Sequence, residues 1–264
     1  MSDSYLKFDV DQNGPMGSKI KELIIRSHNI IVYIDENDTI QWATHGITLE
    51  KDFGDIQNKV SFWEDVSNKI FTKQDAYSCK CLLAEAYARI LEDRDPKLAN
   101  EIIERTVYRI QKHGSEILKQ AYLLSSVVCV IVLFFILGTV VVERNKILSI
   151  IPFDAYSILL TSIFGGIGAF VFTTLRLKNY TPEVIISKRI HQIDGALRIF
   201  YGIISGLIIA LGIKSNIVLG FINQIQITIY LKAFLGVIAG ASEIVIPNLI
   251  KGVEHKIETG KIKA

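Results

Sequence analysis

The sequence predicts a helical membrane protein in which a cytosolic domain of mixed α+β structure, mostly helical, precedes a transmembrane domain of four helices. Charged side chains are dense in residues 1–120 and sparse in residues 121–250. Half of the 264 residues are hydrophobic, and the mean hydropathy is +0.34. Uncharged segments of membrane length occur only after residue 119. The predicted domains are therefore residues 1–118 and 119–250, followed by a basic cytosolic tail over residues 251–264.

The predicted cytosolic domain contains a β-hairpin over residues 29–48. Its two β-rich runs, IIVYI and TIQWA, flank a short polar turn, which is the pattern of two paired strands. Helices are predicted over Asp55–Phe71 and Lys73–Glu92 because their apolar residues recur at mostly helical spacing. Pro96 then opens a third helix that continues into the first span. Gly114 is the position in this helix where we expect a break or hinge.

Composition and motifs argue against an enzyme and against a nucleic-acid-binding protein. The net charge is only +2, which is too small to indicate binding to nucleic acid. The three cysteines (Cys79, Cys81 and Cys129) lack a metal-binding spacing, and the five histidines are scattered along the sequence. The sequence contains no phosphate-binding loop, dinucleotide fingerprint, nucleophile elbow or zinc-protease motif. It therefore predicts no catalytic residue, no metal and no cofactor.

Four apolar segments are predicted to cross the membrane, over residues 120–142, 155–175, 198–214 and 232–250. The first has 23 residues without a charge, and at 1.5 Å per residue it covers about 34 Å, enough for the hydrocarbon core of a bilayer. The third is short, and it spans the membrane if its flanking cations, Arg198 and Lys214, extend to the two interfaces.

The segment between the last two predicted spans, residues 215–230, is compatible with several structures. Its sequence, SNIVLGFINQIQITIY, alternates partly between apolar and polar residues. This pattern fits a surface strand, an interfacial helix or an extension of either neighbouring span. We expect a loop or an interfacial turn that does not cross the membrane.

The distribution of basic residues predicts the orientation of the spans. Lysine and arginine cluster before the first span, in residues 176–198 and in residues 251–264, whereas the two other connections contain fewer. By the positive-inside rule, both termini and the middle connection lie in the cytoplasm, which an even number of spans satisfies. The polar N-terminus also lacks the apolar core of a signal peptide. The expected location is the cytoplasmic (inner) membrane, with the protein as an integral membrane protein.

A single carboxylate, that of Glu243, interrupts the last apolar run, FLGVIAGASEIVIPNLI. A charged residue at the centre of a membrane helix costs about 2.5–3.5 kcal/mol, so it is usually paired, hydrated or functional. Glu243 shares one helix face with Gly236, Gly240 and Pro247, and Pro247 is the expected position of a kink. Small residues that permit close approach of the spans are predicted at Gly165, Gly202, Gly206, Gly236 and Gly240.

The expected depth of Glu243 in the membrane indicates which residues could pair with it. With the C-terminus inside, Glu243 lies about 10 Å below the cytoplasmic boundary, at 1.5 Å per residue. Arg176 ends the second predicted span and Arg198 begins the third at the same boundary. Either guanidinium could pair with the carboxylate through two hydrogen bonds. The sequence therefore predicts a structural intramembrane ion pair, with a polar pathway for ions or protons and an oligomer contact as alternatives.

Residues 155–250 resemble a membrane module at the C-terminal end of uncharacterised bacterial proteins. That module pairs an arginine before its third span, here Arg198, with an A-G-x-S-E-x-x-x-P-x-L pattern. The pattern is matched by Ala239, Gly240, Ser242, Glu243, Pro247 and Leu249. Some proteins of this kind resemble membrane effectors of antiphage defence, in which a cytosolic sensor is joined to spans that perturb the membrane.

The resemblance implies a non-enzymatic, oligomeric membrane effector. Its expected partners are the lipid bilayer, further copies of the same chain, and a cytosolic protein or small anionic ligand sensed by the cytosolic domain. Two other functions are compatible with the sequence. One is an ion channel or small transporter subunit, and the other is a membrane anchor for a larger complex.

The predicted topology can be tested with two single-cysteine variants in a cysteine-free background. Asn145→Cys and Asn216→Cys stand in the two connections that the basic-residue pattern places outside the cytoplasm. Both should react with a membrane-impermeant thiol reagent in intact cells. Labelling of Asn216→Cys only after permeabilisation would show that the number of spans is not four.

Overall fold

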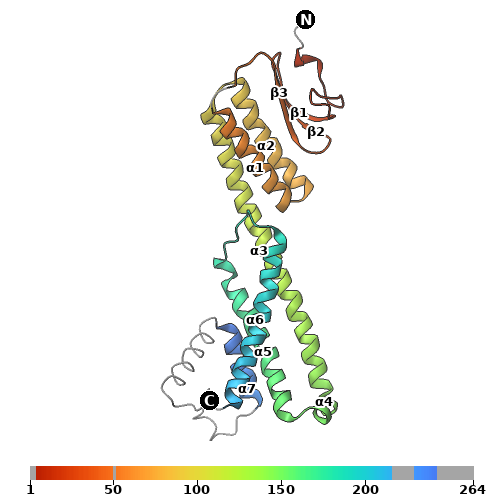
Figure 1. The fold of residues 1–264 in the computed structure, drawn as a ribbon, viewed down its shortest axis with the longest axis vertical. Coiled ribbons are helices and arrows are strands. Elements are labelled where there is room, and N and C mark those ends of the chain that lie inside the picture. The colour runs from red at the N-terminus through yellow and green to blue at the C-terminus, as the bar shows by residue number, and fades with distance from the viewer. Residues whose placement is uncertain (1–3, 50–51, 216–228, 243–264) are drawn as a thin grey trace. The chain divides into compact units, whose positions relative to one another are not determined.

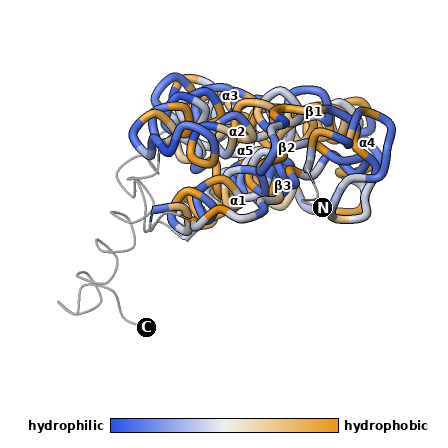
Figure 2. Tube along the Cα trace, turned by 90° about the horizontal axis from the view of Figure 1, so that it is seen from above, coloured by the Kyte–Doolittle hydropathy of each residue, from blue (hydrophilic) through white to orange (hydrophobic). Residues whose placement is uncertain are grey.

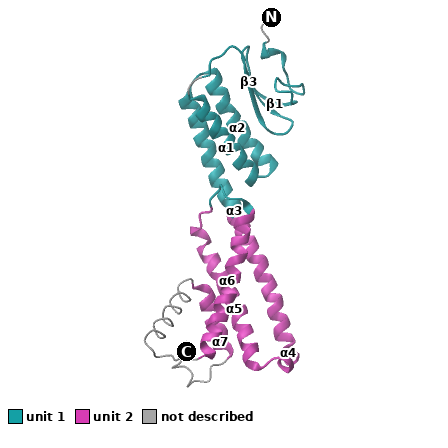
Figure 3. Ribbon diagram, in the orientation of Figure 1, with its two compact units in different colours: residues 1–118, 183–188 teal, residues 119–182, 189–264 magenta. Residues whose placement is uncertain are grey.

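The computed structural model describes residues 4–49, 52–215 and 229–242 of the chain (Figure 1). The protein is mostly helical, with one small sheet. It consists of two compact units (Figure 3). Unit 1 comprises Met1–Leu118 and Glu183–Lys188, and unit 2 comprises Lys119–Pro182 and Arg189–Ala264.

The sheet of unit 1 is antiparallel, with the strand order β1-β2-β3. Its strands are β1 (Ile20–Arg26), β2 (Ile30–Asp35) and β3 (Ile40–Thr44). Strands β2 and β3 lie within the residues expected to form a hairpin, and every residue of the central strand β2 is buried. The sequence did not predict β1. Two register shifts within its pairing with β2 interrupt the alternation of buried and exposed residues by which a strand is recognised.

The side chain of Asp35, at the end of β2, and side chains from two helices hold the turn between β2 and β3. The buried carboxylate of Asp35 accepts two backbone N–H groups of the turn, at 2.9 Å each. Lys80 is also buried and donates a hydrogen bond to the carbonyl oxygen of Asp38, which has a positive φ of 59°. Glu64 accepts the first backbone N–H of β3 at 3.2 Å, and burial raises the pKa of Glu64. Lys80 and Glu64 therefore connect the hairpin to the helices, and Asp35 stabilises the turn itself.

The helices of unit 1 bury one core against the sheet. They are α1 (Phe53–Ile70), α2 (Lys73–Glu92) and the first part of α3 (Pro96–Val142). In Figure 2 the trace of α1 contains both hydrophobic and hydrophilic residues, as an amphipathic helix requires. The ring of Phe53 contacts Trp42 edge-on at 4.7 Å between centroids, and Leu83 is fully buried in the same core.

Helix α3 passes through Gly114 without interruption, so the expected break at this residue is absent. A Cβ atom at Gly114 would lie 3.1 Å from the side chain of Val184 and 3.5 Å from Ile70. The glycine therefore makes room for a close neighbour rather than weakening the helix. This neighbour comes from the segment that follows α5, which the sequence pattern of α3 alone does not reveal.

Unit 2 contains the apolar helices. They are the remainder of α3, the short α4 (Arg144–Ile150), α5 (Phe153–Arg176) with the 3-10 turn η2 (Leu177–Asn179), α6 (Lys188–Lys214) and α7 (Ile229–Ala241). Helix α6 begins at Lys188 rather than at Arg198, so the third predicted span is the second part of a longer helix.

Three helices in the described residues are long and apolar enough to cross a membrane: α3, α5 with η2, and α6. The fourth predicted span, residues 232–250, begins in α7, which is a shorter apolar helix of 13 residues, and continues outside the described residues. Of the ambiguous segment 215–230, only Ser215, Ile229 and Tyr230 are described.

Helices α5, α6 and α7 meet at glycine residues. A Cβ atom at Gly165 would lie 2.9 Å from the Cα atom of Gly206, and its nearest neighbour would be the carbonyl oxygen of Gly202. A Cβ atom at Gly240 would lie 2.9 Å from the Cα atom of Gly165, and one at Gly236 would meet Thr161. Backbone therefore faces backbone on both sides of Gly165. Such an approach increases dispersion contact between membrane helices, for which hydrophobic burial gives no driving force.

The junction predicts that, of two glycine-to-alanine substitutions, only the one at the junction destabilises the protein. Gly165→Ala inserts a methyl group into a backbone contact, which costs about 1–3 kcal/mol where the helices must separate. Gly138→Ala is the matched control in α3, because no atom of another described element lies within 4 Å of its added Cβ. Heating the detergent-solubilised protein and following the monodisperse fraction by size-exclusion chromatography should show a lower midpoint for Gly165→Ala alone. Equal midpoints for the two variants would contradict the junction.

Candidate functional site

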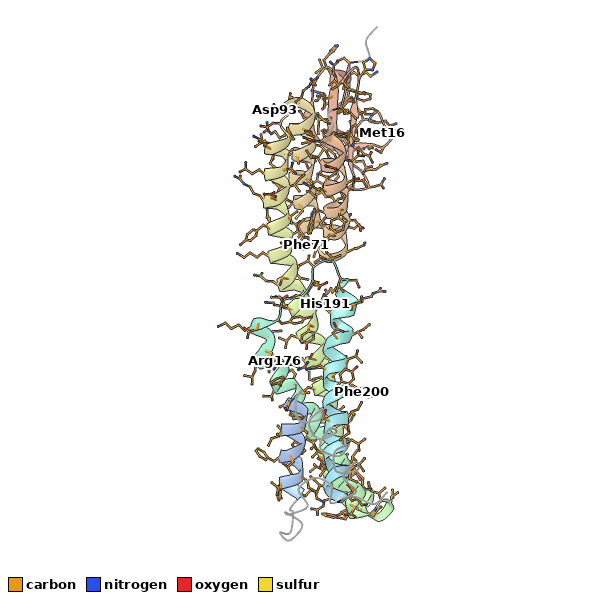
Figure 4. All side chains as sticks on the ribbon, turned by 60° about the vertical axis from the view of Figure 1, so that its left-hand side comes forward. Met16, Phe71, Asp93, Arg176, His191 and Phe200 are labelled. Atoms are coloured by element: carbon orange, nitrogen blue, oxygen red, sulfur yellow. The ribbon has the colours of Figure 1, made fainter. Side chains whose placement is uncertain are left out.

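A polar cavity of about 540 Å³ lies in unit 2 where helix α5 ends. Its walls come from α3, α5, η2, α6 and the residue after η2. We name it the arginine cavity; the residues that line it are Tyr122, Thr173, Arg176, Leu177, Asn179, Tyr180 and Arg198. Within the described residues, no carboxylate belongs to this lining. Figure 4 labels Arg176 on α5 and, on α6, His191.

Both arginines of the cavity lie over one aromatic ring. The guanidinium carbon of Arg176 is 4.2 Å from the centroid of Phe172, and that of Arg198 is 5.6 Å from the same centroid. A cation over the face of an aromatic ring is attracted to it electrostatically. Both arginines also take part in further interactions within the protein. The ring of Phe172 thus brings two positive charges together from α5 and α6.

Thr173 contributes a buried hydroxyl group to the cavity. Only 3% of this residue is exposed, and its Oγ1 has no hydrogen-bond partner among the described residues. Two other threonines of α5, Thr161 and Thr174, donate to the carbonyl oxygen four residues earlier, at 2.8 Å and 3.0 Å. Thr173 departs from this usual arrangement. A buried polar atom without a partner is rare, because it loses its hydrogen bonds to water.

Aromatic residues form another wall of the cavity. The rings of Tyr122 and Tyr180 stack with centroids 4.7 Å apart, and the hydroxyl of Tyr180 lies 3.0 Å from Nδ1 of the buried His191. Burial, followed by the negative charge of Asp194, raises the pKa of Tyr180. Near these rings, Ser126 of α3 donates a hydrogen bond of 3.0 Å to the carbonyl of Gly195 in α6. The wall is thus fixed by contacts between α3 and α6.

The predicted site residues are distributed as follows. Arg176 and Arg198 lie together at the arginine cavity, and the five predicted packing glycines lie at the junction of α5, α6 and α7. Glu243 and Pro247 lie outside the described residues. Sequence reasoning assigned no functional role to Thr173 or to the two tyrosines. The tyrosines had a usable signal, because each stands near the end of an apolar run, where aromatic residues mark the membrane interface.

A second cavity, of about 450 Å³, lies in unit 1 between the start of α2 and the middle of α3. The ring of Phe71 lies 5.5 Å from that of His113, and burial raises the pKa of the Cys79 thiol. The lining includes two cations, Arg109 and Lys112, and also two carboxylates, so its formal charges balance. No group of three potential metal ligands occurs in the described parts of the chain.

The segment Glu183–Lys188, which connects α5 to α6, belongs to unit 1 although the residues on both sides of it belong to unit 2. Val184 is 9% exposed and packs in a cluster at the end of unit 1. The other buried members of that cluster are Val66, Ile70, Cys79, Ile110 and Leu118. Gly114 contacts Val184 on one side of this cluster, as described above. We call this arrangement the Val184 contact.

The fold defines a class: a mostly helical protein with a compact α+β unit and three helices suited to crossing a membrane. Comparison of the chain with protein-family models, with curated proteins and with solved structures gives no match.

The hypothesis of an ion pair between Glu243 and Arg198 predicts a specific pattern of stabilities. Glu243→Gln should be mild, because glutamine still forms interhelical hydrogen bonds of about 0.6 kcal/mol each. Arg198→Gln should lower the thermal midpoint more, because it leaves a carboxylate in a poorly hydrated site. The double variant should recover much of that loss. Additive losses in the double variant, or normal assembly with lost activity in Glu243→Gln, would count against a structural pair.

Proposed function

We propose that this protein is a non-enzymatic membrane effector. In this proposal unit 1 lies in the cytosol and binds a cytosolic protein or a small anionic ligand. Binding changes the arrangement of the spans in an oligomer, and the membrane becomes permeable. The resemblance of residues 155–250 to modules found in antiphage-defence effectors supports a role in such defence.

The observation that carries this proposal is the Val184 contact. A domain that is merely tethered to a membrane needs one connection, which α3 supplies. Here the connection between α5 and α6 is also built into unit 1 through Val184. Burying a valine side chain stabilises a structure by about 1.5–3 kcal/mol. A change in α1, α2 or the start of α3 would therefore act on the membrane helices at a second point.

The cavity of unit 1 supports the sensing part of the proposal. It adjoins the cluster that holds Val184, because Phe71 and Cys79 belong to both the cavity lining and that cluster. Its volume is in the range of small-molecule sites, which is about 300–1,000 Å³. A ligand that moved Phe71 would disturb the packing around Val184. Binding and span movement could be linked in this way through contiguous side chains.

The Val184 contact can be tested in bacterial cells with a membrane-potential dye at matched protein levels. Val184→Ser removes apolar contact and buries a hydroxyl group, which uncouples the segment. We expect this variant to depolarise the membrane to the same extent as a chain lacking residues 1–115, and differently from the full chain. Ile185→Ser is the matched control, because Ile185 is the next residue along the chain and is 62% exposed. This variant should depolarise the membrane as the full chain does.

Two further measurements keep this experiment decisive. Both tryptophans of the chain, Trp42 and Trp63, lie in unit 1, so their fluorescence reports the folding of that unit in the intact protein. Normal fluorescence in Val184→Ser shows that uncoupling, not unfolding, causes the effect. Absence of depolarisation by both the full chain and the truncated chain would favour a membrane anchor over an effector.

A further inference from the structure

We propose that the arginine cavity binds a phosphate group, carried by the headgroup of an anionic lipid or by a soluble phosphate ester. The proposal concerns unit 2 alone and holds whether or not the protein is an effector. Three observations carry it: the paired arginines, the buried threonine hydroxyl and the position of the cavity along the apolar helices.

The paired arginines supply charge and geometry suited to phosphate. Two guanidinium groups approach the ring of Phe172 from α5 and α6. The planar fork of a guanidinium matches two phosphate oxygens and forms strong, charge-assisted hydrogen bonds with them. Among the described residues, no carboxylate belongs to the lining. The carbonyl groups at the C-terminal end of α5 oppose an anion, and the two arginines offset this effect.

The hydroxyl of Thr173 supplies a donor that no group among the described residues uses. Its Oγ1 is buried in the cavity lining and lacks a hydrogen-bond partner among the described residues. The hydroxyls of Thr161 and Thr174 are satisfied within α5 itself. A phosphate oxygen in the cavity would accept the hydrogen bond of Thr173 and remove the cost of leaving it unpaired. The side-chain amide of Asn179 is a further polar group in the same lining.

The cavity stands where the apolar helices become polar. Tyr122 lies near the start of the apolar part of α3, and Asn179 is the last residue of the span formed by α5 and η2. Lipid headgroups lie at this level of a membrane protein, where tyrosine is also enriched. Basic pockets between membrane helices bind lipid phosphates at this level. The volume of about 540 Å³ is sufficient for a phosphodiester with part of its glycerol group.

Binding is to be measured on the full chain in a neutral detergent. One arm titrates short-chain phosphatidylglycerol against short-chain phosphatidylcholine, and a second arm titrates inorganic phosphate and glycerol 3-phosphate. Both tryptophans lie outside unit 2, so tryptophan fluorescence does not report directly on the cavity. Lipid binding is therefore followed by native mass spectrometry, and binding of the soluble anions by calorimetry. Preference for phosphatidylglycerol in the first arm assigns the site to lipid, and saturable binding in the second assigns it to a soluble phosphate.

Matched substitutions distinguish the cavity from general surface charge. Arg198→Gln and Thr173→Val should each weaken binding about tenfold, the effect of losing one hydrogen bond to a charged group. Arg198→Lys, which keeps the charge but loses the fork, should fall between the wild type and Arg198→Gln. Thr174→Val and Lys178→Gln are the controls, because both side chains are exposed and absent from the lining. Both controls should bind as the wild type does.

Each outcome decides the proposal. Weakened binding in the cavity variants, with unchanged controls and an unchanged size-exclusion profile, supports it. Equal weakening in Lys178→Gln would show that diffuse positive charge attracts the anion, and would overturn it. The proposal would also be overturned if the wild type bound neither the lipid of the first arm nor the soluble phosphates of the second. If Arg198→Gln does not assemble, Thr173→Val provides the same test, because valine has nearly the shape of threonine.

Discussion

The backbone contact at Gly165 is the constraint on which the rest of unit 2 depends. Because neither Gly165 nor the facing Gly202 has a side chain, α5 and α6 meet at a fixed register. Thr173 lies about two helical turns further along α5, and Arg198 lies about one turn from Gly202 on α6. The register therefore decides which residues of α6 meet the end of α5. Because α7 also packs against Gly165 through Gly240, α5 has little freedom to rotate.

Local patterns in the sequence predicted a large part of this fold. Strands β2 and β3, helices α1 and α2, and the apolar parts of α3 and α5 lie close to the predicted ranges, because each depends on short-range periodicity. Strand β1 was not predicted, because bulges interrupt the alternation of apolar and polar residues along it. The start of α6 at Lys188 was not predicted, because its first turns contain the charged residues Arg189 and Asp194. A search for apolar segments ends at such charges.

The arginine cavity was less predictable than the helices around it. Arg176 and Arg198 were noticed because cations at the ends of apolar segments are conspicuous. No functional role was predicted for Thr173, since a threonine in a membrane helix normally bonds to its own backbone. Whether a hydroxyl is satisfied depends on helix rotation and on side chains distant in sequence, such as Tyr122 and Tyr180. Hydropathy contains no information about either.

The inclusion of Glu183–Lys188 in unit 1 has a consequence for how the protein is made. Domains generally fold as their residues leave the ribosome, starting from the N-terminus. The cluster around Ile110 and Leu118 cannot be completed at that stage, because Val184 is synthesised after α5. The apolar side chains that Val184 covers in unit 1 therefore stay exposed until the segment after α5 has been synthesised. Completion of the N-terminal unit is thus tied to synthesis of a later helix, and a nascent chain that ends before α5 leaves this apolar surface uncovered.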